Sequence, residues 1–387
     1  MVKNHIPFHR PYIGKEEIKT VTSAIKSGWI TMGPKTAEFE EKFKAYTGAK
    51  YAIAVNSCTA ALHLALEAIG LKEGDEVIVP VMTFTATAEV VCYFKAKPVF
   101  VDVEKDTLNI NWAKIEEKIT SRTKAIITVD YGGQPVDYDE IRKIANRHKL
   151  FIIEDAAHTL PSWYKGRKVG TLADITCFSF YATKTLATGE GGMIVTDNAR
   201  FAERMKVMRL HGMNRDAWKR YDKGGSWYYE VIAAGYKYNT TDINSSLGIA
   251  QLKKLELMWR KRKTIAEIYN SAFKEMSELI TPVIKKGRVT SWHLYVIKLK
   301  IDKLSIDRAE FIDELAKQGV SASVHFIPLY RHPFYRNKFG YKPNQFPNSE
   351  WLYERIVSLP IYPGMSNAQV KRVIKAIKKI IKQYRDV

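Results

Sequence analysis

The chain has 387 residues, of which 46% are hydrophobic and 26% are charged, an ordinary composition for a globular protein of two domains, or of one large domain with a smaller satellite. Its 61 lysine and arginine residues against 41 aspartate and glutamate residues give a formal net charge of +20. The sequence has no apolar run long enough for a membrane span, and its N-terminus lacks the apolar core of a signal peptide. Cys58, Cys92 and Cys177 are widely spaced, which argues against a disulfide framework and a zinc site. We therefore expect a cytoplasmic protein without metal.

Two helices are predicted before the first strand. Residues 14–27 are amphipathic and residues 35–47 form a second helical stretch, with a loop rich in glycine and proline between them. Short apolar runs then alternate with helical stretches such as 60–69 and 87–94. The predicted strands are residues 51–55, 76–80, 98–101, 125–129, 150–153, 175–181 and 192–196. Continuous apolar strands separated by helices are typical of a mostly parallel sheet that is covered on both faces.

The pattern changes in the last third of the chain. Residues 252–269 are predicted as one long helix. Beyond it, short strands mix with helices, and the predicted elements are the strands 294–299 and 320–325 and the helices 308–318 and 367–383. This mixture indicates a smaller α+β domain, so we divide the chain into a large domain at 1–255 and a small domain at 256–387.

The basic residues are spread along the chain and accompany no nucleic-acid-binding motif. The lysines of the last predicted helix lie opposite its apolar positions, which is typical of a solvated helix face. We therefore expect neither a nucleic acid nor a membrane as a partner, and the positive charge suits an acidic small substrate.

A lysine and an acid follow two of the predicted strands. Lys184 comes shortly after the apolar stretch 178–181, and Asp155 comes shortly after the apolar run 150–153. In parallel sheets ligands bind at the carboxyl ends of the strands, where both side chains would lie. Pyridoxal phosphate (PLP) needs a lysine amine for a Schiff base and a carboxylate that keeps its ring nitrogen protonated. The pair predicts a PLP site, although Asp155 alone could be a helix N-cap and Lys184 alone a surface lysine.

Other residues near the strand ends fit the same cofactor. Residues 56–61 end a strand and open a helix, so backbone N–H groups and the Thr59 hydroxyl could hold a phosphate, with a further contact from Ser179. An ordinary helix N-cap explains the same stretch. Phe84 could stack on a flat ring or belong to the core. His158 could hydrogen-bond the neighbouring acid or the ring oxygen of the cofactor, or have a structural role.

The ordered set of motifs resembles the DegT/DnrJ/StrS family of PLP-dependent sugar aminotransferases, a branch of the fold type I (aspartate aminotransferase-like) enzymes. The resemblance runs nearly end to end. It is carried by residues 27–31, 56–61, 80–87, 154–158, 178–192, 211–212, 235–242, 292–295 and 358–365. The family implies an α/β large domain, with a mostly parallel mixed sheet flanked by helices, and a smaller C-terminal α+β domain. Residues 27–31 and 235–244 most resemble the UDP-4-amino-4-deoxy-L-arabinose aminotransferases, which aminate a UDP-4-keto sugar.

The resemblance implies a role for each matching residue. Lys184 would bind the cofactor as a Schiff base and act as general base, and Asp155 would pair with the pyridine nitrogen. His158 is a further candidate catalytic and cofactor-binding residue. The implied phosphate contacts are the side chains of Thr59 and Ser179 and the backbone amides of Cys58 and Ala60. Phe84 would stack on the ring. Asn239 would reach the cofactor phosphate of a neighbouring subunit, so the active unit would be a homodimer. A related dehydratase branch carries histidine at the position of Lys184, so the lysine favours transamination.

The implied reaction moves an amino group from an amino acid, which we expect to be glutamate, to C4 of a UDP-4-keto sugar for cell-surface glycan synthesis. The candidate substrate contacts are Ile30, Thr31, Lys237, Tyr238, His325 and Arg331. For Lys237, His325 and Arg331, a surface or hinge role is an equal alternative. Amination of a 3-keto sugar or a cyclitol ketone stays open, as does a regulatory or binding protein of this fold that has lost turnover. Two residues depart from the pattern of the arabinose-type enzymes. Cys58 stands where a small residue is usual, and Phe84 stands where those enzymes have tryptophan.

Overall fold

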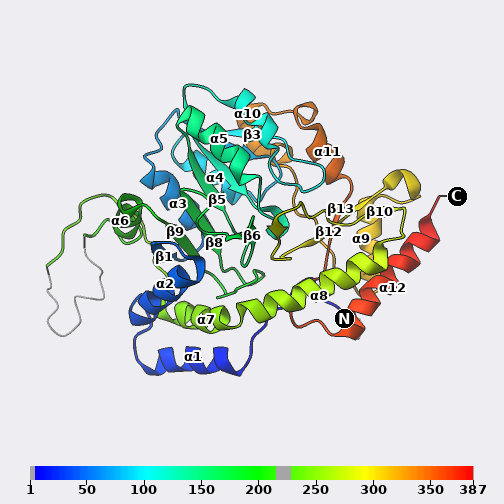
Figure 1. Ribbon diagram of the computed structural model, residues 1–387, viewed down its shortest axis with the longest axis horizontal. Helices are drawn as coiled ribbons and strands as arrows, with labels where there is room; N and C mark the ends of the chain where they lie inside the picture. Colours follow the sequence, from blue (N-terminus) through cyan, green and yellow to red (C-terminus); the bar gives the residue numbers. More distant parts are fainter. Residues whose placement is uncertain (1–4, 215–227, 387) are drawn as a thin grey trace.

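A seven-stranded sheet lies at the centre of the protein, whose computed structural model describes residues 5–214 and 228–386 (Figure 1). In order across the sheet, the strands are β1 (Tyr51–Val55), β9 (Gly192–Thr196), β8 (Ile175–Ser179), β5 (Phe151–Asp155), β4 (Thr123–Val129), β2 (Glu76–Pro80) and β3 (Lys97–Val101). Neighbouring strands pair in parallel, except that β9 is antiparallel to both β1 and β8. The mostly parallel sheet that the apolar strands predicted is confirmed, and so is the mixed sheet that the family resemblance implied.

Helices cover both faces of this sheet, because successive strand residues such as Ile152 and Ile153 bury their side chains on opposite faces. One face packs against α3 (Cys58–Ala68), α4 (Ala86–Tyr93) and α6 (Ala199–Met208). The other packs against α2 (Pro34–Thr47), α5 (Tyr138–His148) and α7 (Asp242–Lys253), and α1 (Lys15–Lys26) lies against α7.

A second, smaller core lies at the other end of the molecule. It is built on a three-stranded sheet of β10 (Leu279–Ile280), β12 (Tyr295–Leu299) and β13 (Ile356–Leu359). The helices that pack on it are α8 (Leu255–Phe273), α9 (Arg308–Lys317) and α12 (Asn367–Tyr384). Other short elements include the strands β6 (Trp163–Tyr164), β7 (Arg167–Lys168) and β11 (Arg288–Val289) and the helices α10 (Pro333–Phe339) and α11 (Pro347–Tyr353).

Helix α8 connects the two cores, as Figure 1 shows. Its first turn buries Leu255 and Met258 against the large sheet, whereas Ile265 and Phe273 are buried in the smaller core. Helix α10 lies between β12 and β13 in the sequence, yet its Tyr335 packs in the core of the large sheet. The chain thus returns from the smaller core to the larger one. A division of the chain near residue 255 therefore falls at the start of a helix that both cores share.

Two predictions of secondary structure were wrong. The stretch 252–269 is not one helix from its first residue, because Lys254 has φ −108° and ψ 10°, so α7 ends at Lys253 and α8 begins at Leu255. Residues 320–325 form no strand and make only isolated bridges, from Val320 to Ile6 and from Ser323 to Ser358. Within the described ranges, no helix is both long and apolar enough to span a membrane.

Candidate active site

The carboxyl edge of the large sheet gathers the candidate site residues. Asp155 and Ser179 are the last residues of β5 and β8, and Cys58 opens α3 just after β1. Because β9 runs in the opposite direction, its first residue, Gly192, lies at the same edge, paired with Ser179. A pocket of about 410 Å³ lies there, and Lys184 and Asp155 both line it.

Asp155 is a nearly buried carboxylate, only 6% exposed, and both of its oxygens are hydrogen-bonded. Thr87 Oγ1 donates to Oδ2 across 2.8 Å, and the backbone N–H of Ala157 donates to Oδ1 across 3.2 Å. The thiol of Cys58 lies 3.9 Å from Oδ1. Burial raises the pKa of Asp155, and the Thr87 hydroxyl and the Ala157 N–H oppose that rise because they stabilise the charged form.

Lys184 is half-buried on a tight loop between β8 and β9. Its backbone N–H donates to the carbonyl of Tyr181 across 2.8 Å, and the Thr188 N–H donates to the carbonyl of Phe180 across 2.8 Å. Burial lowers the pKa of the Lys184 amine, with the opposite effect coming from the charge of Asp155. A lowered pKa increases the fraction of neutral amine, which is the form that reacts with a carbonyl.

The N-terminus of α3 offers donors for an anion. Ser57 is the N-cap and its Oγ accepts the N–H of Ala60 across 3.0 Å, so the amide of Ala60 is already used. The first intrahelical bond runs from the N–H of Ala61 to the carbonyl of Ser57, so the amides of Cys58 and Thr59 have no carbonyl partner within the helix. Both residues line the pocket, and these two amides and the Thr59 hydroxyl are suited to a phosphate.

Gly192 lets this helix end approach the sheet. A Cβ atom at residue 192 would lie 2.6 Å from the carbonyl carbon and oxygen of Ser57 and 2.9 Å from the nitrogen of Cys58. Any side chain here would push the N-terminus of α3 away from the strand and from Ser179. The glycine therefore allows the N-terminus of α3 to lie close to Ser179 at this end of the pocket.

Aromatic rings form the walls. The Phe84 side chain is 59% exposed and lines the pocket, so one of its faces is open to a flat ligand. On another wall, His158 stacks against Phe326 at 6.0 Å between centroids and packs against His293 at 4.4 Å. Nδ1 of His158 accepts the N–H of Gly132 across 3.2 Å, so this nitrogen is occupied by the backbone rather than by Asp155.

These features together fit PLP. A buried carboxylate is available for a ring nitrogen, and an amine with a lowered pKa for an aldehyde. The free amides at the start of α3 suit the phosphate. An exposed aromatic face, Phe84, suits the ring. The Asp155 carboxylate and the N-terminus of α3 are held by hydrogen bonds within the fold, so these two parts of the site are formed before a ligand enters it.

The structure brings only one of the predicted substrate contacts into this pocket. His325 lines it, with Nδ1 2.9 Å from the Ser358 hydroxyl and its ring stacked on Phe8 at 5.4 Å. Among the described residues, the other predicted substrate contacts do not line the pocket of a single chain; they are Ile30, Thr31, Lys237, Tyr238 and Arg331.

Two of these outlying residues have partners elsewhere. The Arg331 guanidinium forms two hydrogen bonds with the carboxylate of Glu350, one of them from Nε across 2.9 Å, so its charge is balanced within the fold. Tyr238 Oη lies 2.9 Å from Nδ1 of His63, and its carbonyl accepts the N–H of Asn56.

Asn239 also lies outside the pocket of its own chain. Its Nδ2 donates to the carbonyl of Thr240 across 3.2 Å, whereas its Oδ1 is buried without a partner in the part of the chain that is described. The carbonyl of the preceding residue, Tyr238, accepts the N–H of Asn56, which directly precedes Ser57, the N-cap of α3. Asn239 is thus anchored beside the sheet edge without reaching Lys184.

Sequence reasoning missed several pocket residues. Phe8, His9, Thr83 and His293 line the pocket. Thr83 and His293 lie within the motifs 80–87 and 292–295, so their position in those motifs was the available signal. Nothing in the sequence near the N-terminus indicated that Phe8 and His9 would return to the carboxyl edge of a sheet that begins at residue 51.

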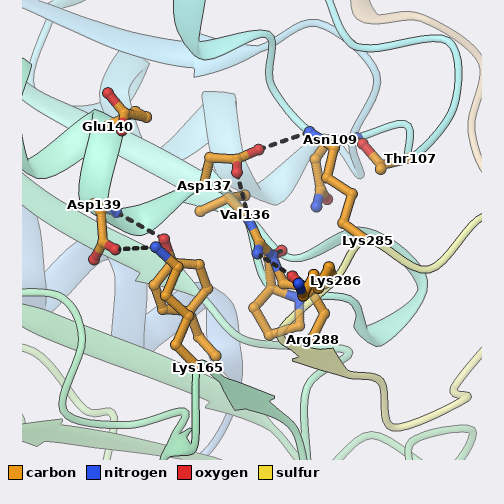
Figure 2. Close-up of polar contacts among 12 residues, drawn as sticks. Thr107, Asn109, Val136, Asp137, Asp139, Glu140, Lys165, Lys285, Lys286 and Arg288 are labelled. Carbon is orange, nitrogen blue, oxygen red and sulfur yellow. Dashed lines mark hydrogen bonds and ion pairs between the residues drawn. The ribbon is translucent and has the colours of Figure 1, made fainter.

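The segment that carries His293 is tied by ion pairs to Asp137, the residue that precedes α5 beside the large sheet. Figure 2 shows Lys285 and Arg288 directed toward Asp137, with 2.8 Å between Lys285 Nζ and Asp137 Oδ2. Three residues beyond Arg288, the Ser291 hydroxyl donates to the carbonyl of His158 and accepts the N–H of His293. These contacts fix the wall of the pocket that His158 and His293 form.

Comparisons with known proteins extend over nearly the whole chain. A model of the DegT/DnrJ/EryC1/StrS aminotransferase family matches residues 11–378. The spore coat polysaccharide biosynthesis protein SpsC of Bacillus subtilis (strain 168) is 48% identical over 382 residues, which cover 98% of each chain. The "putative sugar aminotransferase Spr1654" of Streptococcus pneumoniae matches in its PMP form with a TM-score of 0.92 and 34% identity, covering 98% of this chain and 99% of that one. PseC of Helicobacter pylori, an aminotransferase involved in the biosynthesis of pseudoaminic acid, matches with a TM-score of 0.91 and 30% identity, covering 98% and 100%.

Proposed function

The chain belongs to the DegT/DnrJ/EryC1/StrS aminotransferase family, and from this premise we propose that it transfers the amino group of glutamate to the C4 keto group of a UDP-linked sugar. Structures of this fold include PLP and PMP forms, so the chain is a PLP-dependent aminotransferase, as the sequence predicted. The observation that carries the proposal is the pairing of Lys184 and Asp155 in one pocket at the carboxyl edge of the sheet. The choice of a UDP-4-keto sugar rests on the resemblance of residues 27–31 and 235–244.

The proposed division of labour follows from the positions of the side chains. When bound, the cofactor supplies an electron sink that stabilises negative charge on the substrate carbon that loses a proton. Asp155, held by Thr87 and Ala157, would keep the ring nitrogen protonated. Lys184 Nζ would hold the cofactor at rest and would then move a proton to and from the substrate carbon.

The remaining pocket residues would bind and orient. The amides of Cys58 and Thr59, the Thr59 hydroxyl and Ser179 would hold the phosphate, and Phe84 would lie against the ring. His158, whose Nδ1 is occupied by Gly132, would present its Nε2–H to the ring oxygen. One pocket would receive the amino acid and the keto sugar in turn, which predicts ping-pong kinetics.

The proposed active unit is a homodimer. Asn239 lies outside the pocket of its own chain, and its buried Oδ1 has no partner among residues 5–214 and 228–386, which supports a contact across a subunit interface. The candidates Ile30, Thr31, Lys237 and Tyr238 also lie outside that pocket and would reach the substrate of the neighbouring subunit. Within each subunit we propose two units, 1–255 and 256–387, that meet along α8.

The test is the visible absorption spectrum of the purified enzyme. Glutamate should abolish the absorption band of bound PLP and release one 2-oxoglutarate per site, and a UDP-4-keto sugar should restore the band and yield a UDP-amino sugar. The matched comparisons are a UDP-3-keto sugar and the same 4-keto sugar without the nucleotide. A band that responds to another amino acid but not to glutamate would overturn the donor. Equal restoration by either comparison sugar would overturn the proposed acceptor.

A further inference from the structure

Two threonines form a hydrogen-bonded chain that ends on Asp155. Thr83 follows β2, and Thr87 lies in the first turn of α4. Their hydroxyl oxygens are 2.8 Å apart, and Thr87 Oγ1 donates to Asp155 Oδ2 across another 2.8 Å. Both threonines are buried, Thr83 at 2% exposure and Thr87 at 0%.

The direction of the two hydrogen bonds follows from counting the hydroxyl hydrogens. A threonine hydroxyl has one hydrogen to donate and can accept on its oxygen. Because Thr87 gives its hydrogen to the carboxylate, the hydrogen between the two hydroxyls must come from Thr83. The bonds therefore all point from Thr83 through Thr87 to Asp155, an arrangement in which each bond polarises the next.

We propose that Thr87 and Thr83 are positioning residues that orient the Asp155 carboxylate and keep it ionised in its buried site. The inference rests on the proposed pairing of Asp155 with the pyridine nitrogen. One oxygen, Oδ1, accepts from the Ala157 backbone, so Thr87 supplies the side-chain donor that holds Oδ2. With both oxygens held, the carboxylate cannot rotate freely, and the remaining acceptor capacity of Oδ2 is available to an N–H in the pocket.

The needs of the fold alone do not account for the two hydroxyls. Helix α4 begins after Thr85, whose side chain makes no capping bond, and the Thr87 hydroxyl is directed at Asp155 rather than at the helix backbone. A buried position without a polar task is occupied at lower cost by valine, which has the shape of threonine. The pair is therefore explained by the charge that it serves.

The test measures the binding of PLP to the apoenzyme, by titration of protein fluorescence over a range of pH. Removal of a hydrogen bond to a charged group should weaken binding in Thr87→Val by about tenfold or more. Because Asp155 would then gain its proton more readily, the loss of affinity on acidification should begin at a higher pH than in the wild-type enzyme. Thr83→Val should weaken binding by about two- to threefold. Thr87→Ser, which keeps the hydroxyl, should restore the affinity.

Two further variants make the outcomes decisive. Thr128→Val removes the hydroxyl of another fully buried threonine, which neither hydrogen-bonds to Asp155 nor lines the pocket, and should leave the affinity unchanged. Asp155→Asn should lose more affinity than Thr87→Val. The proposed positioning role of the threonines would be overturned if Thr87→Val kept the wild-type affinity and pH dependence. It would also be overturned if Thr87→Ser or Thr128→Val lost as much affinity for PLP as Thr87→Val. Wild-type affinity in Asp155→Asn would instead overturn the assignment of Asp155, and neither result depends on the identity of the sugar.

Discussion

The backbone N–H of Gly132 donates a hydrogen bond to Nδ1 of His158 across 3.2 Å. Because Nδ1 is the acceptor, the proton of the neutral ring must lie on Nε2. Burial holds the pKa of His158 well below its usual value, and the nearby charge of Lys184 acts in the same direction. The contact therefore presents a permanent donor to the pocket instead of a group that titrates near neutrality.

We expect His158 to stay neutral, with its proton on Nε2, from about pH 5.5 to 8. Nitrogen-15 NMR of enzyme labelled at histidine measures this directly, and His158→Gln assigns the resonance by its disappearance. Exposed His211 provides a reference resonance in the same spectra. A His158 resonance that titrates near the value of free histidine would contradict the expected state.

Two acids buried beneath the site should make stability depend on pH. Asp130 and Glu154 are both fully buried, and burial raises the pKa of each. Thr176 Oγ1 donates to Glu154 Oε2 across 2.7 Å, and the Asp130 carboxyl and the Tyr138 hydroxyl also interact with the Glu154 carboxyl group. Since the folded state holds protons that the unfolded state has released, this pair stabilises the fold most at low pH, and the contribution is lost as pH rises through the raised pKa values.

Glu154→Gln should therefore stabilise the protein at alkaline pH. The amide keeps the shape of the protonated acid and has no proton to lose, so we expect a gain of about 1–3 kcal/mol near pH 8 and little change near pH 5. Urea unfolding of the two proteins at both pH values measures the difference. A variant that is less stable than the wild type at the higher pH would show that Glu154 is ionised in the folded state.

The sequence indicated the large sheet well because its strands are short, apolar and buried on both faces. The end of the predicted strand 150–153 marked Asp155, whereas Ser179 lay inside the predicted strand 175–181, which in the structure ends at that residue. It failed where partners are distant. Val320 and Ser323 each pair with a remote residue, so a local apolar run there did not make a strand. The capping of α2 could not be predicted either, because the group that caps it is also distant in the sequence. Gly33 has no side chain to cap with, and the capping carboxylate belongs to Asp242, which accepts the Gly33 N–H across 2.8 Å.

The site was predictable in part. Lys184 and Asp155 are reactive types at strand ends, and the structure places both in one pocket. The partners of Asp155 were not predictable, because the alignment of Thr87 with Oδ2 depends on how α4 lies against β5. Nor was the role of Arg331 predictable, since its positive charge suggested an anionic ligand and the fold supplies Glu350 instead. Charge type is visible in a sequence, whereas its neutralisation is a tertiary property.

The ion pairs of Asp137 should contribute measurably to stability (Figure 2). The Arg288 side chain is only 4% exposed, so Asp137→Asn would leave a buried guanidinium without its carboxylate. We expect a loss of about 2–4 kcal/mol in the free energy of unfolding, measured by urea denaturation. The control is Glu140→Gln, because Glu140 pairs with Lys143 at 37% and 65% exposure and should contribute little. Equal losses in the two variants would contradict a special role for the buried pair.

Lys184→Ala should abolish amino transfer without unfolding the protein. The side chain is half-buried and its proposed role is chemical, so we expect a loss of about a thousandfold or more in kcat and a thermal midpoint near that of the wild type. Lys165→Ala is the matched control, since Lys165 is exposed and pairs with Asp139 away from the pocket. Amino transfer that survives in Lys184→Ala would refute the proposed role of the lysine.

Mixing two inactive variants would test whether subunits share their sites. If Asn239 serves the pocket of a partner, Asn239→Ala should be impaired although its own Lys184 is intact. In a hybrid dimer of Lys184→Ala and Asn239→Ala, one site carries both changes and the other carries neither. Random exchange makes about half of the dimers hybrids, so about a quarter of the wild-type activity should return, measured as amino sugar formed after the two variants are unfolded and refolded together.

Each variant treated alone is the control. Activity that never exceeds the average of the two separate variants would mean that Asn239 acts within its own subunit, and the buried Oδ1 would then need a ligand other than a neighbour's cofactor.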